Sequence, residues 1–299
     1  MHQGKHIFSQ ITEFIPRREF DMFVKQYKGN QRIRSLDCRD QLLAMMFGQL
    51  TNLRSLRGIV LCLNAHAKLL YHLGFKTNKL VLSTLARANE NRNWKIYLDL
   101  TQLLIKKARK LYINDNDFNI ELNGSVYALD STVIELCLST FRWAYFELEK
   151  SAIKIHTQLD LRGNIPAFFV ISEAKVHDVN FMDILEFEFE LDVKKIADLY
   201  KNRWRIELFF KWIKQHLRIE VFWGCSANAV KTQICTAMCA FLIVAIMKKQ
   251  LKIDRNLYEI LQILSVSQFE KTPINTMLHE TELQNFNERS PRQACLFDF

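Results

Sequence analysis

The stretch 200–214, YKNRWRIELFFKWIK, decides how the chain is organised. It contains no Gly or Pro, and its apolar residues recur at helical spacing, which predicts one helix over the whole stretch. Four polar residues, Tyr200, Arg203, Glu207 and Lys214, fall on one narrow stripe of that helix. Apolar side chains cover most of the remaining girth, which is typical of a largely buried helix. We therefore expect the polar stripe to face a cleft, where a carboxylate flanked by Arg and Lys suits a metal ion and a phosphate.

A purely structural alternative fits part of this pattern. Arg203 and Glu207 are four residues apart, so they can form an ion pair along the helix, which stabilises an exposed helix by about 0.2–0.5 kcal/mol. The alternative concerns one pair only. The full spacing of Tyr, Arg, Glu and Lys is a more specific pattern than the pair.

This full spacing resembles the Y-R-E-K signature of bacterial insertion-sequence transposases of the "IS-four" family. The resemblance implies that Glu207 is the last acid of a DDE metal site. It also implies that Tyr200, Arg203 and Lys214 contact the transposon end.

The composition favours a soluble protein with a polyanionic partner. The 299 residues suffice for one large domain with a smaller one attached, and 49% hydrophobic content can fill their cores. The formal net charge is +9, with 41 Lys and Arg against 32 Asp and Glu. Nucleic acid is the first partner this charge indicates, and an anionic membrane surface is the second.

Cysteine usage and the apolar runs indicate a cytosolic protein. The seven cysteines are an odd number without a C-x-x-C pair, which favours reduced thiols over disulfides or a zinc site. The first residues lack the features of a signal peptide. The uncharged run 234–247 is shorter than the roughly 20 apolar residues of a membrane span, so we expect a buried core helix there.

Residues 9–112 show helical periodicity almost throughout. Asp37 is a candidate helix cap, and the run from residue 53 to residue 73 is expected to be a helix that ends at Gly74. The short segment LSTLARANENR presents Arg87 and Arg92 together with Asn residues, and Arg and Asn read base edges in the major groove. A solvated helix with capping residues is an equally good reading. This region also resembles the small N-terminal domain of one branch of these transposases, through MHQGK-x-x-F-S-Q and A-x-A-N-E-N-R.

Strand patterns begin after an Asn- and Asp-rich linker at 113–124. The run SVYALDST ends in Asp130, Ser131 and Thr132, and SAIKIHTQLDL and IPAFFVISEA alternate around a turn, which predicts a hairpin. The order of strands and helices resembles a ribonuclease-H-like α/β core, in which Asp130 would be the first catalytic acid. A turn or helix cap is the structural alternative for Asp130.

These patterns divide the chain into three parts. They are an all-helical N-terminal domain for binding DNA ends at 1–115, a ribonuclease-H-like transposase core at 116–265, and a partly loose tail at 266–299.

The resemblance implies a two-metal mechanism for cutting and rejoining DNA. Two Mg²⁺ ions about 3.5–4 Å apart stabilise the attacking and leaving oxygens, and carboxylates such as Asp130 and Glu207 hold them. Arg203 and Lys214 would then hold the phosphate backbone. We expect His156 and His177 to be structural, and Asp178 and Asp183 to be cap and surface residues; Asp160 and Glu173 are open as accessory acids.

The chain departs from the family between Asp130 and Glu207. The middle acid, its fourth strand and a β-rich insertion have no counterpart, as after an internal deletion. The alternating run from Leu185 to Val193 could pair as a strand and bring an acid near the site, and Glu188, Glu190 and Asp192 are the candidates.

The resulting prediction is a shortened, cytoplasmic and nucleoid-associated bacterial DDE transposase that binds DNA but cuts weakly or not at all. Its partners would be double-stranded DNA, as terminal inverted repeats and target DNA, and a second copy of the chain on that DNA, with no membrane. The alternatives are a non-catalytic DNA-binding relic or regulator of transposition, and a general Mg²⁺ nuclease.

Overall fold

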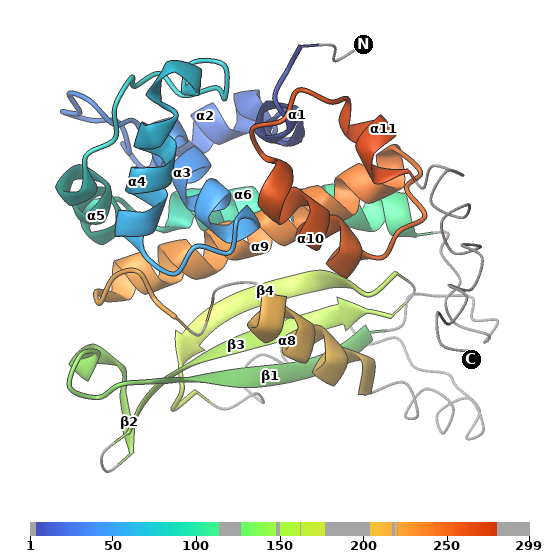
Figure 1. Ribbon diagram of the computed structural model, residues 1–299. Coiled ribbons are helices and arrows are strands. Elements are labelled where there is room, and N and C mark those ends of the chain that lie inside the picture. Colours follow the sequence, from blue (N-terminus) through green and yellow to red (C-terminus); the bar gives the residue numbers. More distant parts are fainter. Residues whose placement is uncertain are drawn as a thin grey trace, which may run out of the picture.

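The computed structural model describes residues 4–113, 127–147, 150–161, 163–176, 204–216, 219 and 221–279. In these residues the protein combines a layer of helices with an antiparallel sheet (Figure 1). The helices before the sheet are α1 Ile7–Thr12, α2 Arg17–Gln26, α3 Cys38–Leu50, α4 Leu56–Ala65, the 3₁₀ turn η1 Ala67–Leu69, α5 Leu82–Asn91 and α6 Lys95–Tyr112. The helices after it are α8 Trp204–His216, α9 Ala227–Gln250, α10 Leu257–Ser267 and α11 Ile274–Leu278.

The helical region largely follows its sequence pattern. Asp37 caps α3 as predicted, because its side chain accepts a hydrogen bond from the backbone N–H of Asp40. The single helix expected over 53–73 is wrong. The chain leaves helical geometry at His66, whose ring stacks on Phe269 with centroids 3.9 Å apart. This tertiary contact fits the break between α4 and η1.

The sheet has four strands: β1 Tyr127–Leu136, β2 Tyr145–Glu147, β3 Lys150–Asp160 and β4 Ile165–Glu173. Every pairing in it is antiparallel, and β3 lies in the middle, with β1 along one edge and β2 and β4 along the other. The predicted hairpin of β3 and β4 is confirmed. Its turn includes Asn164, whose φ of 53° is a left-handed conformation that Asn tolerates.

Strand β1 is longer than expected. The pattern was predicted to end at the Asp-Ser-Thr sequence, but pairing with β3 continues to Leu136, which lies opposite Ser151. The β-branched residues Val133 and Ile134 favour this extension. Asp130 is therefore in the middle of a strand, opposite Thr157, and the turn or cap reading of Asp130 is wrong.

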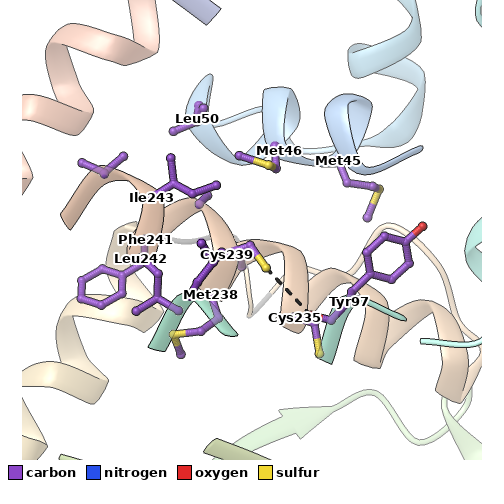
Figure 2. Close-up of a cluster of buried hydrophobic side chains, with 14 of the residues drawn as sticks. Met45, Met46, Leu50, Tyr97, Cys235, Met238, Cys239, Phe241, Leu242 and Ile243 are labelled. Atoms are coloured by element: carbon purple, nitrogen blue, oxygen red, sulfur yellow. Dashed lines mark hydrogen bonds between the residues drawn. The ribbon is translucent and has the colours of Figure 1, made fainter. Parts of the chain in front are cut away.

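Helix α9 is the centre of the core. It contains the apolar run 234–247, and it is the one helix among the described residues that is long and apolar enough to cross a membrane. Nearly all of its most apolar part is buried inside the protein, as predicted for a core helix. Figure 2 shows its side chains against α3 and α6; the labelled residues are Met45, Met46, Leu50, Tyr97, Cys235, Met238, Cys239, Phe241, Leu242 and Ile243.

One continuous cluster of buried side chains extends from Ile7 to Leu278, so the described helices and strands share a core. The linker predicted at 113–124 falls, after Ile113, outside the described residues. The division into domains at 1–115 and 116–265 therefore stays a prediction.

The first part of the predicted loose tail is packed. The backbone N–H of Ile7 donates to the carbonyl of Glu270 at 2.8 Å, and Ile274 and Leu278 are buried. Residues 266–279 of the tail that was predicted to be partly loose are therefore packed against the start of the chain. Residues 280–299 lie outside the described part.

Candidate functional site

Helix α8 carries the predicted last acid. It begins at Trp204, so Tyr200 and Arg203 lie outside the described residues. The expectation that this helix is buried over most of its girth is wrong, because Trp204 is 52% exposed and Leu208 is 48% exposed. One face alone packs on the rest of the protein, through the buried residues Ile206, Phe209, Phe210 and Ile213.

Two hydrogen bonds fix α8 alongside β1 (Figure 1). Near the start of α8, the Arg205 guanidinium donates to the carbonyl of Leu161 at 3.2 Å. Leu161 directly follows β3, whose last residues pair with the first residues of β1. Near the end of α8, Lys214 Nζ donates to the carbonyl of Val133 at 2.9 Å, in the second half of β1. The helix therefore lies obliquely across this part of the sheet (Figure 1), with its start near the end of β3 and its end near the second half of β1.

Asp130 lies on the face of the sheet that α8 covers. Alternate residues of a strand share a face, so Asp130 and Thr132 are on the same side of β1. Thr132 lines a small cavity of about 10 Å³ together with Phe210 and Ile213 of α8. Asp130 itself is partly buried, and its Oδ1 accepts a hydrogen bond of 2.8 Å from the N–H of Ser131.

Glu207 lies on the same flank of α8 as Lys214, since seven residues make nearly two helical turns. These seven residues rise about 10 Å, at about 1.5 Å each. The three residues from Val133 back to Asp130 also span about 10 Å, at about 3.3 Å each. Counted from Lys214 and Val133, which the hydrogen bond joins, Glu207 and Asp130 are thus about equally far back along their own elements.

The described residues do not make a complete metal site. They contain no group of three or more His, Cys, Asp or Glu side chains placed to hold a metal ion. Asp130 and Glu207 are hard oxygen donors of the kind that Mg²⁺ prefers, but two carboxylates leave a two-metal site short of ligands. The candidate replacements Glu188, Glu190 and Asp192 lie outside the described residues.

Within the described residues, no cleft is seen at Glu207. Glu207 is exposed, and the small cavity beneath α8 is lined by apolar side chains and threonines, without Asp130 or Glu207. The reason is that α8 packs on the sheet with its apolar face, which leaves the flank with Glu207 open to solvent.

The other candidate acids lie apart from Asp130. Asp160 belongs to the opposite face of the sheet and is buried, and its carboxylate lies 3.7 Å from Nη2 of Arg109. Glu173 is the last residue of β4 and pairs with Ile153 of β3, which in turn pairs with Ile134 of β1. Glu173 is therefore separated from Asp130 by the strand β3 and by four residues along β1.

The histidines give no ligand set among the described residues. His156 is buried, and its Nε2 lies 2.7 Å from Oγ of Ser172, as expected for a structural histidine. His177, Asp178 and Asp183 fall outside the described part of the chain.

The predicted base-reading residues of α5 separate into two groups. Arg92 is used inside the protein, where Nη1 donates to the carbonyl of Asp37 at 2.9 Å and to Oε1 of Gln41 at 2.8 Å. Asn89 is also buried, and its side-chain oxygen accepts from Gln41 Nε2 at 2.7 Å. Arg87 is exposed. Arg92 is half-buried, so Arg87 is the one of these three residues that is exposed.

Arg87 borders a groove that the sequence patterns did not indicate. The groove has a volume of about 610 Å³ and lies between α5 and the loop that follows α2. The loop contributes Lys28, Arg32 and Arg34. These cations are more than 50 residues from Arg87 in the sequence, and the only signal for them was the density of basic residues in QYKGNQRIR.

Two family models match parts of the chain. Residues 3–76 match a model described as "Domain of unknown function (DUF4372)", and residues 183–243 match one described as "Transposase DDE domain". The second match includes Glu207 and Lys214 and does not reach Asp130.

Three curated proteins are similar to parts of this chain. "Putative transposase y4zB" of Sinorhizobium fredii is 37% identical over 97 residues, or 32% of this chain and 27% of that protein. "Probable transposase for insertion sequence element IS5377" of Geobacillus stearothermophilus is 35% identical over 68 residues, or 23% of this chain and 18% of that protein. "Putative transposase for insertion sequence element IS4SA" of a Synechocystis strain is 32% identical over 91 residues, or 30% and 27%.

The chain thus spans about a quarter or less of the length of these relatives. No solved structure matches it.

Proposed function

We propose that this chain, a relative of bacterial insertion-sequence transposases, binds the inverted ends of such an element and cuts and rejoins DNA at the face shared by β1 and α8. The observation that supports the proposal most is that α8 packs on the face of β1 to which Asp130 belongs. The hydrogen bond from Lys214 to Val133 holds the helix that carries Glu207 against the strand that carries Asp130. The match of the DDE model to the segment with Glu207 supports the same assignment.

The fold proposed for this region is a shortened ribonuclease-H-like core. An antiparallel set of β1, β3 and β4 with α8 on one face is compatible with it. The N-terminal helices α1 to α6 would form the all-helical part that binds DNA ends. Membership of the "IS-four" group in particular stays a prediction.

DDE transposase domains in general depend on a divalent metal ion, and we assign Mg²⁺ to Asp130 and Glu207. When bound, the metal stabilises negative charge on the oxygens that attack and leave phosphorus. The protein's part is to hold the DNA against these two carboxylates. Lys214 suits this role because an ammonium group has three N–H donors, of which the carbonyl of Val133 accepts one. Tyr200 and Arg203 would contact the same DNA end, as the resemblance implies.

Weak cleavage is part of the proposal. With Asp130 and Glu207 as the acids and no third acid beside them in the described residues, a second metal ion would be poorly held. The same observation favours the second candidate function, a DNA-binding relic or regulator that competes for transposon ends. Both candidates place the protein on double-stranded DNA in the bacterial cytoplasm, at the nucleoid, as a homodimer on two ends.

Cleavage of the element's own ends separates these candidates. The full chain would be incubated in single turnover with Mg²⁺ and a duplex that carries the inverted ends flanking its gene. We expect slow, end-specific nicking that falls at least about tenfold, or about 1.4 kcal/mol, in Glu207→Gln and in Asp130→Asn. Glu135→Gln is the control, because Glu135 is exposed on the same strand.

Each other outcome has a plain meaning. Tight binding of the ends without any nicking would support the relic. Equal cutting of unrelated DNA would support a general nuclease. Nicking that persists unchanged in both site variants would remove Asp130 and Glu207 from the mechanism.

A further inference from the structure

The groove between α5 and the loop after α2 is strongly cationic. Its charged lining residues are Lys28, Arg32, Arg34, Arg87 and Arg92, and no Asp or Glu is among the described residues that line it. The chain as a whole has 32 acidic residues, so their absence from this lining leaves a local excess of positive charge.

Four of these cations are free to meet a ligand. Lys28, Arg32, Arg34 and Arg87 are exposed, and none of them forms an ion pair within the described part of the chain. Arg92 differs because its guanidinium donates inward to the carbonyls of Leu36 and Asp37. The groove thus has four cations available for a ligand, and the fifth, Arg92, is used in hydrogen bonds within the protein.

Two cations of the loop, Lys28 and Arg32, have a left-handed backbone conformation. Lys28 has a φ of 53° and Arg32 a φ of 58°, both in the left-handed region that Gly and Asn occupy most readily. Lys28 takes this conformation where α2 ends, as Lys252, which does not line the groove, does after α9. The conformation fixes the direction in which the loop leaves α2.

The loop is also held in place before any ligand binds. A Cβ on Gly29 would lie 2.5 Å from Cδ1 of Ile96 and 2.7 Å from Sγ of Cys38, so the backbone packs closely on α6 and α3. The Asn30 side chain accepts a hydrogen bond of 2.8 Å from the N–H of Cys38. A loop fixed in this way binds without a large ordering cost.

The opposite wall of the groove is one stripe of α5. Thr84, Arg87 and Asn91 are spaced by three and four residues, and all three line the groove. Thr84 contributes a hydroxyl and Asn91 an amide beside the guanidinium of Arg87. These groups hydrogen-bond phosphate and sugar oxygens in protein–DNA contacts.

We propose that this groove binds the phosphate backbone of double-stranded DNA, with Lys28, Arg32 and Arg34 on one side and Arg87 on the other. Cations on both walls of so broad a groove suit a polyanion with regularly spaced phosphates better than a single small anion. Single-stranded nucleic acid is disfavoured because it needs exposed aromatic side chains for base stacking. Tyr27 is the one aromatic residue in the described lining, and its hydroxyl donates to Asp99. The inference deepens the proposed function, on which it rests, by naming where the DNA lies.

Salt-dependent binding tests this groove directly. The full chain would be titrated with a 30-base-pair duplex at several salt concentrations, without divalent metal. Arg32→Asn, Arg34→Gln and Arg87→Gln remove one cation each, and Asn tolerates the left-handed backbone at position 32. We expect each change to reduce the slope of log K against log salt by about 0.9, equally for any duplex sequence. Arg34→Lys keeps the charge and should keep the slope.

Arg54→Gln is the matched control, because Arg54 is exposed and is not among the groove residues. Slopes in the three groove variants that equal the slope of Arg54→Gln would overturn the proposal. Duplex RNA or single-stranded DNA that displaces the duplex at equal concentration would also overturn it.

The two proposals fail separately. If the groove variants bind duplex DNA like the Arg54→Gln control but nicking still depends on Glu207, the groove proposal fails and the proposed function stands. If the groove variants lose binding slope but nicking does not depend on Glu207, the proposed function fails and the groove proposal stands.

Discussion

Lys214 of α8 donates a 2.9 Å hydrogen bond to the backbone carbonyl of Val133 in β1, which attaches the helix with Glu207 to the strand with Asp130. Among the described strands, β1 lies at an edge of the sheet, and the carbonyl of Val133 accepts this side chain. This hydrogen bond joins α8 to β1 near the end of the helix. The candidate site depends on that attachment, because Asp130 and Glu207 belong to different elements.

Removing the Lys214 ammonium should loosen α8. Lys214→Met keeps the aliphatic stem and deletes the donor, and we expect a loss of about 0.5–1.5 kcal/mol of unfolding free energy. Hydrogen exchange of the α8 amides, compared with urea unfolding, measures the effect. Lys211→Met is the control on the same helix, because Lys211 is exposed. Equal protection of α8 in both variants would show that the hydrogen bond does not fix the helix.

The buried face of α8 should dominate its stability. Phe210 is buried and lines the cavity above Thr132, so Phe210→Ala should cost about 3–5 kcal/mol. Leu208 is half-exposed on the same helix, and Leu208→Ala should change stability by less than about 0.5 kcal/mol. Chemical denaturation of the two variants tests the contrast. Similar losses would mean that α8 packs through a different face.

Arg92 and Arg87 should have opposite roles although they are neighbours on the chain. Arg92→Gln removes the hydrogen bonds to Asp37 and Gln41, and we expect a loss of about 1.5–3 kcal/mol of stability. Arg87→Gln should leave stability within about 0.5 kcal/mol and weaken duplex binding. Thermal melts and binding isotherms on both variants provide the comparison. A stable Arg92→Gln protein would argue against its internal role.

Buried thiols should make the protein less stable at alkaline pH. Burial raises the pKa of Cys239 from 9.0 to about 12, so the folded protein keeps this thiol neutral where the unfolded chain ionises it. The unfolding free energy should therefore fall as the pH rises from about 9 towards 12, by up to about 1.4 kcal/mol per pH unit for this group.

Urea unfolding of the wild type and Cys239→Ala across this pH range measures that slope. Alkylation provides a second check, since Cys137 is exposed and its hydrogen bonds with Ser139 lower its pKa. Iodoacetamide at pH 8 should label Cys137 in the native state and leave Cys239 unlabelled. Rapid native labelling of Cys239 would contradict its burial.

The sequence predicted those parts of the fold in which local pattern and burial agree. Helices α5 and α6 and the hairpin of β3 and β4 follow from periodicity, because each presents one face to the core. The burial of α8 was overestimated at Trp204 and Leu208. Periodicity shows which side chains are apolar, but it does not show whether another element covers them.

The candidate site was predictable only in part. The spacing of Glu207 and Lys214 correctly places both on one flank of α8, and the strand pattern of SVYALDST correctly includes Asp130 in β1. The end of β1 and the basic groove were missed. Both depend on contacts between distant segments, such as Arg92 with Asp37, which local patterns do not contain.

Binding of a divalent ion is the most direct measure of whether Asp130 and Glu207 share one site. Mn²⁺ suits carboxylate ligands, and its EPR signal reports the free ion, so the dissociation constant of the full chain can be measured without any DNA. We expect Asp130→Asn and Glu207→Gln each to weaken binding at least about tenfold, with the double variant little weaker than either single one, because both would hold the same ion. Wild-type affinity in the double variant, or losses that simply add, would contradict a shared site.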